Sequence, residues 1–281
     1  MSADALLGID EALGVMRTDP RYADLVRDAY LDRDVREAAE RFRASAEFVE
    51  VRGMVPDWRG LQVLDLGAGN GIASYAFASL GVARVYCVEP SLSKEVGCRA
   101  IRRLTEGLPV LTIAACGEEI PLPEGTVDVV YTRQVLHHVS FLPEFLRECA
   151  RVLKKGGTLI ACREHVVRDQ RELGTFLANH AMHQLAGGEN ALEMERYVGA
   201  IRAAGLELRK VLGPWESVIN AFPAVRSDRE LKELPAAILR RQFGGAGLWL
   251  GSVPAVGGLV RAYLTWRSAP GRMYSFWAAK A

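Results

Sequence analysis

The sequence predicts an α/β protein built on a doubly wound, seven-stranded, mostly parallel β-sheet. The first observation is residues 63–71 (VLDLGAGNG), an apolar segment that ends at an acid and turns through three glycines before helical spacing begins at Ile72. The second is residues 84–89 (RVYCVE), another apolar segment ending in an acid, about twenty residues later. Apolar runs of this kind suit strands that helices cover on both faces.

The glycine loop at residues 67–71 predicts a ligand pocket. Because glycine lacks a Cβ, the backbone N–H groups of this loop can approach a ligand closely. The helix that begins at Ile72 adds free N–H groups at the carboxyl edge of the sheet, where open α/β sheets bind ligands. A tight turn without a ligand is the alternative, and Glu89, at the spacing of a ribose-binding acid, argues against it.

The glycine spacing then separates two classes of cofactor. A dinucleotide fingerprint, G-x-G-x-x-G, would place its third glycine at position 72, but that residue is Ile72 and the third glycine is Gly71. Asp65 stands just before the turn, where a carboxylate suits a cationic group better than a pyrophosphate. Glu89 ends the next strand, where a carboxylate accepts hydrogen bonds from ribose hydroxyls. An amino acid joined to a ribose indicates S-adenosyl-L-methionine (SAM), and an NAD-dependent oxidoreductase is the alternative from another class.

Further segments match a known family in order and spacing. They are residues 116–123 (CGEEIPLP), 126–131 (TVDVVY), 134–139 (QVLHHV), 151–161 (RVLKKGGTLIA) and, weakly, 271–278 (GRMYSFWA). With the glycine loop, these segments make the chain resemble the class I SAM-dependent methyltransferases, in the small-molecule, type 11 branch related to the ubiquinone-biosynthesis enzymes. The resemblance spans roughly residues 60–163. It implies an enzyme, a methyltransferase with a Rossmann-like fold and SAM as its cofactor.

The resemblance also implies which residues contact SAM. Residues 65–69 would contact its methionine end, Glu89 its ribose, residues 117–118 its adenine, and residues 133–134 its amino group and methyl. By number, the implied cofactor residues are Asp65, Gly67, Ala68, Gly69, Glu89, Pro90, Gly117, Glu118, Arg133 and Gln134. One departure is Cys116, where relatives of this type often carry an Asp that receives the adenine amino group. A backbone carbonyl or Glu118 would take that role here.

Histidines indicate the acceptor side of the site. Because the loops after the fourth and fifth strands face the methyl group in such folds, the five histidines would converge on one chamber. A histidine suits the removal of a hydroxyl proton near neutral pH. The candidate catalytic residues are His138, His165, His180 and His183. The alternative is that each of them is only a structural hydrogen-bonding group.

A metal site is a second alternative for part of this group. His180 and His183 lie three residues apart and would share a helical face, with Glu164 or Glu189 completing the ligand set. Sulfonium chemistry does not require a metal, and no acidic triplet accompanies the pair. We therefore predict no metal.

Two segments lie outside the resembling core. We predict that residues 1–58 form a helical cover. Residues 59–213 are predicted to form the core, which includes a lid segment at residues 164–190. An insertion at residues 214–270 precedes the closing strand at 271–281. The resemblance makes Tyr22, Tyr30, Arg41, Phe42 and Ser45 pocket candidates in the cover, and packing on the sheet is the favoured interpretation for each of them.

The second half of the insertion is unusually apolar. Residues 243–260 carry no charge, but they contain six glycines and Pro254. That density of glycine and proline argues against a transmembrane helix. A buried core extension is the favoured interpretation, ahead of a homo-oligomer interface and of a surface for a lipidic acceptor.

Composition favours a cytoplasmic protein. Lysine and arginine number 35 against 34 aspartate and glutamate, and the net charge of +1 argues against a nucleic-acid-binding surface. Five cysteines without a C-x-x-C pair suit free thiols in a reducing compartment. Acidic residues interrupt the N-terminal stretch early, so we expect no signal peptide. The expected partner is a small-molecule substrate, with no nucleic acid and no transmembrane segment.

The predicted activity is transfer of the methyl group of SAM to a small polar metabolite. Oxygen is the preferred acceptor atom because of the histidines, on a sugar-like or secondary-metabolite substrate. Nitrogen and carbon acceptors remain open. A non-catalytic, SAM-binding partner of another chain is the alternative outside enzymes.

Overall fold

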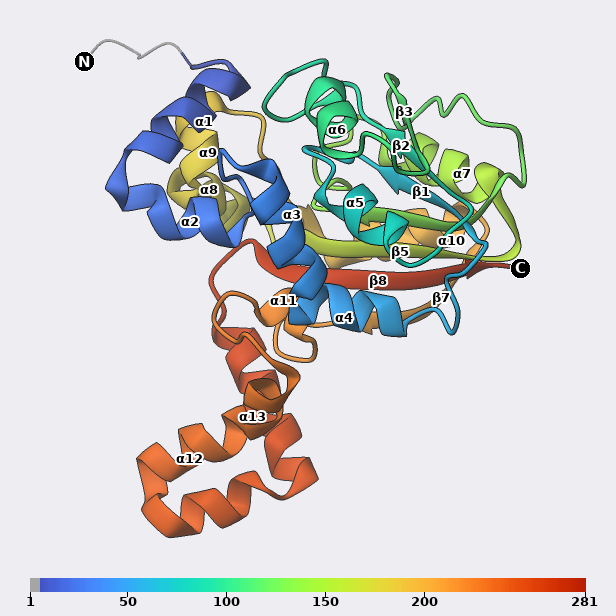
Figure 1. Cartoon of the computed structure of the whole chain (residues 1–281). Helices are drawn as coiled ribbons and strands as arrows, with labels where there is room; N and C mark the ends of the chain where they lie inside the picture. The colour runs from blue at the N-terminus through green and yellow to red at the C-terminus, as the bar shows by residue number, and fades with distance from the viewer. Residues whose placement is uncertain (1–5) are drawn as a thin grey trace.

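One mixed β-sheet runs through the computed structural model, which describes residues 6–281 apart from the side chain of Leu248 (Figure 1). The strands are β1 (Gln62–Leu66), β2 (Arg84–Val88), β3 (Val110–Ile113), β4 (Val127–Arg133), β5 (Leu153–Val167), β6 (Leu192–Glu193), β7 (Leu206–Leu212) and β8 (Arg272–Lys280). Their order is β3-β2-β1-β4-β5-β8-β7, with β6 paired to β5 outside this path. Only β8 among these described strands runs antiparallel to its neighbours. The predicted doubly wound sheet with a reversed last strand is confirmed, and the short β6 is an addition.

Helices cover both faces of the sheet (Figure 1). They are α1 (Ile9–Thr18), η1 (Pro20–Tyr22), α2 (Ala23–Asp28), α3 (Val35–Ala44), α4 (Ala46–Gly53), α5 (Ile72–Ala78), α6 (Cys98–Leu104), α7 (Leu142–Val152), α8 (Gln170–Asn179), α9 (Ala181–Ala186), α10 (Met194–Ala203), α11 (Val218–Ala221), α12 (Asp228–Gly251) and α13 (Pro254–Arg267). Helices α3, α4 and α5 pack on one face, and α7 and α10 pack on the other.

Two hydrophobic cores explain why the strands are apolar at successive positions. Alternate side chains of a strand point to opposite faces of its sheet. Val63 of β1 therefore joins the core under α3, α4 and α5, and Leu64 joins the core under α7 and α10. Both side chains are fully buried.

The strand register brings several chain segments to one edge of the sheet. Asp65, near the end of β1, pairs with Cys87 of β2 and with Tyr131 of β4. Because β5 is parallel to β4, the loops that follow β1, β2, β4 and β5 all leave from the same edge. These loops carry the site residues predicted from the sequence.

Helices from two distant parts of the chain cover this edge. Helices α1 and α2 lie beside α8 and α9, which follow β5 (Figure 1). The Leu7 N–H donates a hydrogen bond to the Leu185 carbonyl at 2.9 Å, which joins the two segments. Leu13 and Met16 of α1 are buried beneath this cover.

Helix α7 passes directly into β5, because α7 ends at Val152 and Lys154 already belongs to β5. The Lys154 ammonium pairs with the Asp128 carboxylate at 2.8 Å, and Asp128 also accepts the Gln62 N–H. This contact ties β1, β4 and β5 together at the edge opposite the site.

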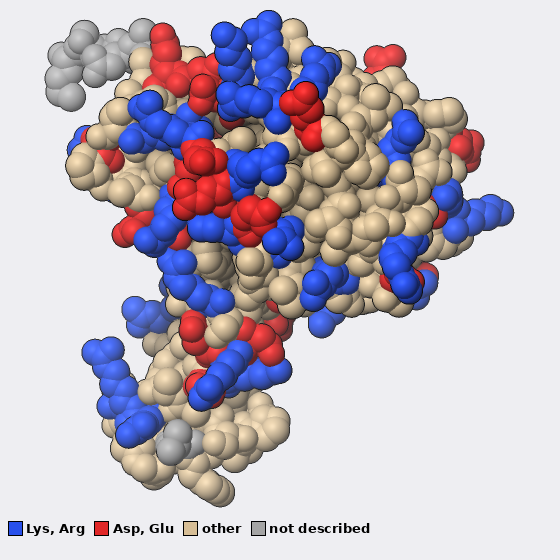
Figure 2. All heavy atoms as spheres, viewed as in Figure 1, with Lys and Arg blue, Asp and Glu red and all other residues tan. Residues whose placement is uncertain are grey.

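The insertion projects away from the sheet (Figure 1). Helix α12 is kinked at Gly244, where φ is 60°. The side chains of Trp249 and Leu259 are each 70% exposed and that of Trp266 is 66% exposed, so the favoured buried core extension is wrong. Figure 2 shows mostly uncharged atoms over the far part of this projection on the face in view. Within residues 6–281, no helix combines the length and apolarity needed to cross a bilayer.

Candidate active site

The glycine loop exposes its backbone because larger residues would not fit there. Gly67 has a φ of 72°, and a Cβ on it would lie 2.5 Å from Cγ2 of Val135. Gly117 is closed in by Phe145, whose Cε2 would lie 2.2 Å from an added Cβ. At both positions glycine lets the chain pass close to a neighbouring side chain while the backbone faces open space.

Two adjoining cavities open along this edge of the sheet. One, of about 460 Å³, lies between the ends of β1 and β2 and residues 115–118. The second, of about 350 Å³, extends from the glycine loop to the histidines. The walls of both include Gly67, Val96, Gln134 and His138, which mark the junction. All ten residues predicted to contact the cofactor line one cavity or the other.

Two carboxyl groups at this junction are poised for a ligand with an amino group and hydroxyls. Asp65 is 2% exposed and accepts a hydrogen bond from Ser74 Oγ at 2.6 Å, and burial raises its pKa to about 7. Glu89 accepts the N–H groups of Gly69 and Ser91, each at 2.9 Å, and burial raises its pKa. An ammonium group beside Asp65 would restore the charged carboxylate, so the residues fit the aminoacyl and ribosyl parts of SAM.

Arg133 also lies on the wall, but its charge is neutralised inside the protein. Its guanidinium pairs with the Glu47 carboxylate from α4 at 2.7 Å and donates to Gln134 Oε1 at 2.9 Å. This geometry lets Arg133 orient the Gln134 amide at the junction. The guanidinium is committed to Glu47 and is therefore a positioning group.

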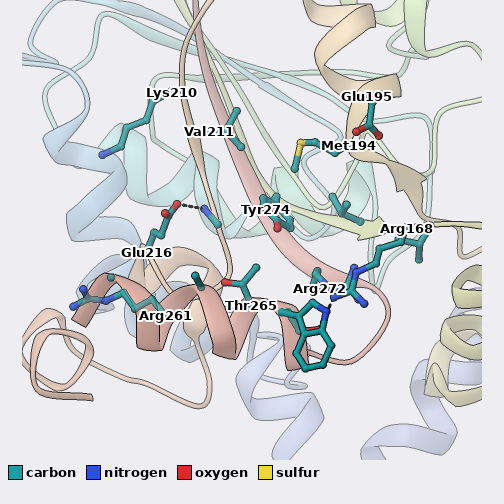
Figure 3. Close-up of a pocket in the computed structure, with 16 residues that line it drawn as sticks. Arg168, Met194, Glu195, Lys210, Val211, Glu216, Arg261, Thr265, Arg272 and Tyr274 are labelled. Atoms are coloured by element: carbon teal, nitrogen blue, oxygen red, sulfur yellow. Dashed lines mark hydrogen bonds between the residues drawn. The ribbon is translucent and has the colours of Figure 1, made fainter. Parts of the chain in front are cut away.

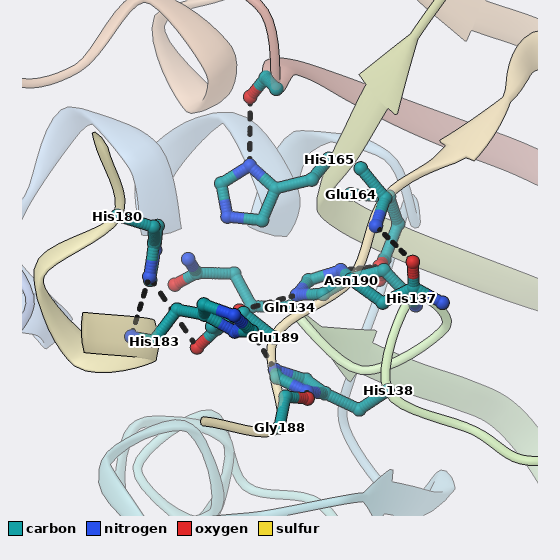
Figure 4. Close-up of polar contacts among 12 residues, drawn as sticks. Gln134, His137, His138, Glu164, His165, His180, His183, Gly188, Glu189 and Asn190 are labelled. Atoms are coloured by element: carbon teal, nitrogen blue, oxygen red, sulfur yellow. Dashed lines mark hydrogen bonds and ion pairs between the residues drawn. The ribbon is translucent and has the colours of Figure 1, made fainter. Parts of the chain in front are cut away.

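Histidines and a carboxylate form a chamber next to the junction (Figure 4). Four of the described histidines line it, and His183 is not on its wall; the residues are His137, His138, His165, His180 and Glu189. His137 and His138 follow β4, His165 lies near the end of β5, and the others come from the segment after β5. Three of the four predicted catalytic residues thus line this chamber, and the role of His183, which follows His180 in α9, stays a prediction.

Each inner imidazole is held by a hydrogen bond through Nδ1. His137 Nδ1 lies 2.6 Å from the Glu164 carboxylate, and His165 Nδ1 lies 2.7 Å from the Gly271 carbonyl. Because both partners are acceptors, each Nδ1 carries the proton and each Nε2 keeps a free lone pair. Burial lowers the pKa of His137 to about 3 and also lowers that of His165 and His180, so these rings are neutral at neutral pH.

Glu189 lies at the centre of the chamber. Its Oε2 lies 3.6 Å from His138 Nε2 and 3.9 Å from His137 Nε2. Its Oε1 lies 3.9 Å from His180 Nδ1. The carboxylate is thus surrounded by three imidazoles at distances longer than a hydrogen bond.

Comparisons with known proteins show which family the central part of this chain matches. Residues 64–161 match the family described as methyltransferase domain. A ubiquinone biosynthesis O-methyltransferase of Rhizobium etli is 29% identical over 178 residues, which cover 62% of this chain and 71% of that protein. The protein of the same name from Caulobacter vibrioides is 36% identical over 121 residues, and the alignment spans 42% of this chain and about half, 47%, of that relative. The chain contains a class I SAM-dependent methyltransferase domain. Its cofactor is SAM.

A solved structure shows that the methyltransferase shares its fold with this class. A SAM-dependent methyltransferase from Mesorhizobium loti superposes with a TM-score of 0.54 at 16% identity, over 84% of this chain and 98% of that one. At this identity the likeness concerns the fold alone. It agrees with the Rossmann-like architecture of the sheet described above.

Some wall residues of the methyltransferase were not found from its sequence. Helix α1 contributes Ile9, Leu13 and Met16 to the walls. The described walls of both cavities leave out the five pocket candidates of the cover, as the favoured packing on the sheet predicts: Tyr22, Tyr30, Arg41, Phe42 and Ser45. Phe42 and Tyr30 instead pack in the core, and the Tyr30 carbonyl accepts a hydrogen bond from Asn70. The i, i+3, i+4, i+7 spacing of apolar residues 9–16 was the available signal.

A third, larger cleft of about 930 Å³ lies elsewhere in the methyltransferase, between α13 and strands β7 and β8 (Figure 3). Among the described residues, its walls share no member with the two cavities above. Basic side chains line it: Arg168, Lys210, Arg261 and Arg272. Arg272 is already paired with Glu172 at 2.9 Å.

Proposed function

We propose that this methyltransferase transfers the methyl group of SAM to an oxygen atom of a small polar metabolite on a sugar-like or secondary-metabolite scaffold. The observation that carries the proposal is the chamber of imidazoles that joins the cavity beside residues 115–118 at Gln134 and His138. The relatives named above as O-methyltransferases support oxygen as the acceptor atom. We do not assign the acceptor of those relatives to this chain.

The cofactor would lie across the junction of the two cavities, against the ten predicted residues. Asp65 would accept its amino group, Glu89 its ribose hydroxyls, and residues 115–118 would lie against its adenine. When bound, SAM supplies a methyl group on a positively charged sulfur, which is a strong electrophile. The protein therefore has to place an acceptor oxygen in line with that methyl group and remove the proton of the acceptor.

His138 is the residue we assign to proton removal. It lines both cavities, and its Nε2 faces Glu189, which would stabilise an imidazolium. In the transfer step, the acceptor oxygen forms a C–O bond with the methyl carbon while the methyl–sulfur bond breaks. The electron pair of that bond stays on sulfur, and the acceptor proton passes to His138.

The cover would bind the carbon skeleton of the acceptor. Leu13 and Met16 of α1 form an apolar wall opposite the imidazoles. A ligand with hydroxyls on one side and carbon atoms on the other suits such a chamber. Closure by α1 and α9 would also exclude water, which otherwise competes for the polar groups.

A methyl-transfer assay tests the proposal. The enzyme is supplied with SAM carrying a ¹³C-labelled methyl group and with panels of sugar derivatives, phenols and amines, and the products are analysed by mass spectrometry and ¹³C NMR. We expect an O-methyl signal, and His138→Gln should lower kcat about 100-fold or more while SAM affinity stays within twofold. Glu106→Gln, at an exposed position after α6, is the control.

Other results would select the alternatives. An N-methyl or C-methyl product would replace the oxygen assignment. Binding of SAM without turnover of any panel member would favour a cofactor-binding partner protein.

A further inference from the structure

We propose that His137, His165 and Glu189 hold a divalent first-row transition metal ion, such as Zn²⁺ or Mn²⁺, at the inner end of the histidine chamber (Figure 4). The catalytic meaning of this site rests on the proposed O-methyl transfer, since the ion would bind the acceptor oxygen. The binding site itself rests only on the geometry of these residues. It replaces the prediction of no metal made from the sequence.

The three side chains present one ligand atom each to a common point. These atoms all lie within 4.8 Å of one another, and His137 Nε2 lies 3.9 Å from Glu189 Oε2. Metal–ligand bonds of about 2.0–2.2 Å would bring such atoms to roughly 3.3 Å apart. The required movement is about 1 Å, and it can come from Glu189, because Gly187 and Gly188 precede it.

Both imidazoles have the outer hydrogen bonds that metal ligands need. A ligating histidine usually donates its second N–H to a carboxylate or a backbone carbonyl, which fixes the tautomer and aims the lone pair. His137 has this arrangement with Glu164, which also accepts the backbone N–H groups of Val135 and His137. His165 has it with the Gly271 carbonyl. The two Nε2 atoms are therefore prepared to bind an ion.

Hydrogen bonds alone explain the position of the Glu189 carboxylate less well than a bound ion does. The three imidazoles around its carboxylate lie 3.6, 3.9 and 3.9 Å away, beyond hydrogen-bond length. A carboxylate held among nitrogen atoms at these distances leaves room for an atom that contacts several of them. An ion at this point would draw the nitrogen and oxygen atoms together.

The ligand set selects the class of metal. Two imidazole nitrogens and one carboxylate oxygen suit Mn²⁺, Fe²⁺ or Zn²⁺ better than Ca²⁺ or Mg²⁺, which prefer oxygen ligands. Three protein ligands leave a coordination position open, which is typical of catalytic and not of structural sites. The His180 and His183 pair considered from the sequence does not form this site, because His183 lies off the chamber wall.

An acceptor hydroxyl at the open position would lose its proton more readily. A bound divalent ion lowers the pKa of an oxygen ligand, as it does for water. His138, whose Nε2 is 3.6 Å from Glu189, would then take the proton. The ion keeps its charge and its oxidation state, so the same bonds form and break in the transfer step.

Metal binding to the whole protein tests the inference directly. Protein stripped with EDTA and dialysed is titrated with Zn²⁺ by calorimetry, and X-ray absorption on the loaded protein reports the ligands. We expect one Zn²⁺ per chain with nitrogen and oxygen ligands including two imidazoles. Glu189→Gln, which keeps the size of the side chain, should weaken binding by about tenfold or more.

The matched control is Glu106→Gln, at an exposed position after α6, which should change the Zn²⁺ affinity less than twofold. Absence of stoichiometric Zn²⁺ and Mn²⁺ binding, or equal affinity of wild type and Glu189→Gln, would overturn the site. If stripped enzyme still forms an O-methyl product at full rate and binds no ion, the metal inference fails and the proposed function stands. If the ion binds as expected but the product is N-methyl or C-methyl, the proposed function fails and the site stands.

Discussion

Asp65 is a buried carboxyl group that serves ligand binding at the expense of stability. Burial raises its pKa to about 7, so in the folded protein without cofactor it holds a proton that the unfolded chain releases near pH 4. The native state thus binds more protons between about pH 4 and pH 7. Stability from this group is complete below pH 4 and is lost as the pH rises through 7.

Asp65→Asn should remove this pH dependence. We expect the free energy of unfolding of the variant, relative to wild type, to rise by on the order of 2–4 kcal/mol between pH 4 and pH 8. SAM affinity should fall, because an amide cannot supply the negative charge for the amino group. Urea unfolding of both proteins at several pH values measures the first effect, and other titrating groups cancel in the difference. Parallel stability curves would contradict the assignment.

Glu89→Ala should weaken SAM binding by about 1–3 kcal/mol. The substitution removes the acceptor for ribose hydroxyls, and it also frees the Gly69 N–H that now donates to Glu89 at 2.9 Å. Calorimetry with SAM measures the loss. Glu106→Ala, at an exposed position after α6, is the control and should bind like wild type; equal affinity of the two variants would remove Glu89 from the site.

The residues of the cofactor cavity could be predicted because their signals are local. Asp65 and the glycines lie within a few residues, and Glu89 follows one strand later. The role of His137 could not be predicted, because its partner Glu164 is 27 residues away and meets it only through the pairing of β4 with β5. Glu189 enters the chamber through a loop whose path depends on the packing of the cover.

At the scale of elements, the loop that carries Glu189 depends on backbone conformations that only glycine adopts easily. Gly188 has a φ of 79°, and nothing lies within 4 Å of an added Cβ. Gly188→Ala should therefore lower the free energy of unfolding by about 1 kcal/mol through backbone strain alone. Urea denaturation measures this change.

The same substitution in α10 should act in the opposite direction. Gly199 lies in the exposed face of this helix, and an added Cβ there also meets nothing within 4 Å. Gly199→Ala should raise the free energy of unfolding by about 0.5–1 kcal/mol, because alanine has the higher helix propensity. Equal changes in the two variants would show that the φ of Gly188 does not matter.

Element boundaries show where local patterns end. The strands β1, β2 and β4 could be predicted, because each is an apolar run whose side chains fill both cores. The end of α7 could not be predicted from the local sequence, because Gly156 and Gly157, which resemble a helix stop, lie inside β5. An added Cβ at Gly157 would lie 2.8 Å from the Lys154 carbonyl and 3.0 Å from the Asp128 carbonyl of β4. The second contact comes from a neighbouring strand and leaves no signal in the local sequence.

At the scale of the whole molecule, the apolar part of the insertion was predicted to be core because apolar residues are usually buried. The structure places Trp249 and Leu259 on a projection, away from both cores of the sheet. Composition alone does not show which side of a helix has a partner. The sheet is already closed by α7, α10 and the N-terminal helices, so the insertion finds no face left to cover.

Replacing exposed apolar side chains of the projection should leave the fold intact. Trp249→Lys and Leu259→Lys should each change the free energy of unfolding by less than about 0.5 kcal/mol, since both side chains are 70% exposed. Leu13→Lys, at a fully buried position, is the contrast and should cost several kcal/mol. A large loss of stability in Trp249→Lys would mean that the projection packs against the sheet.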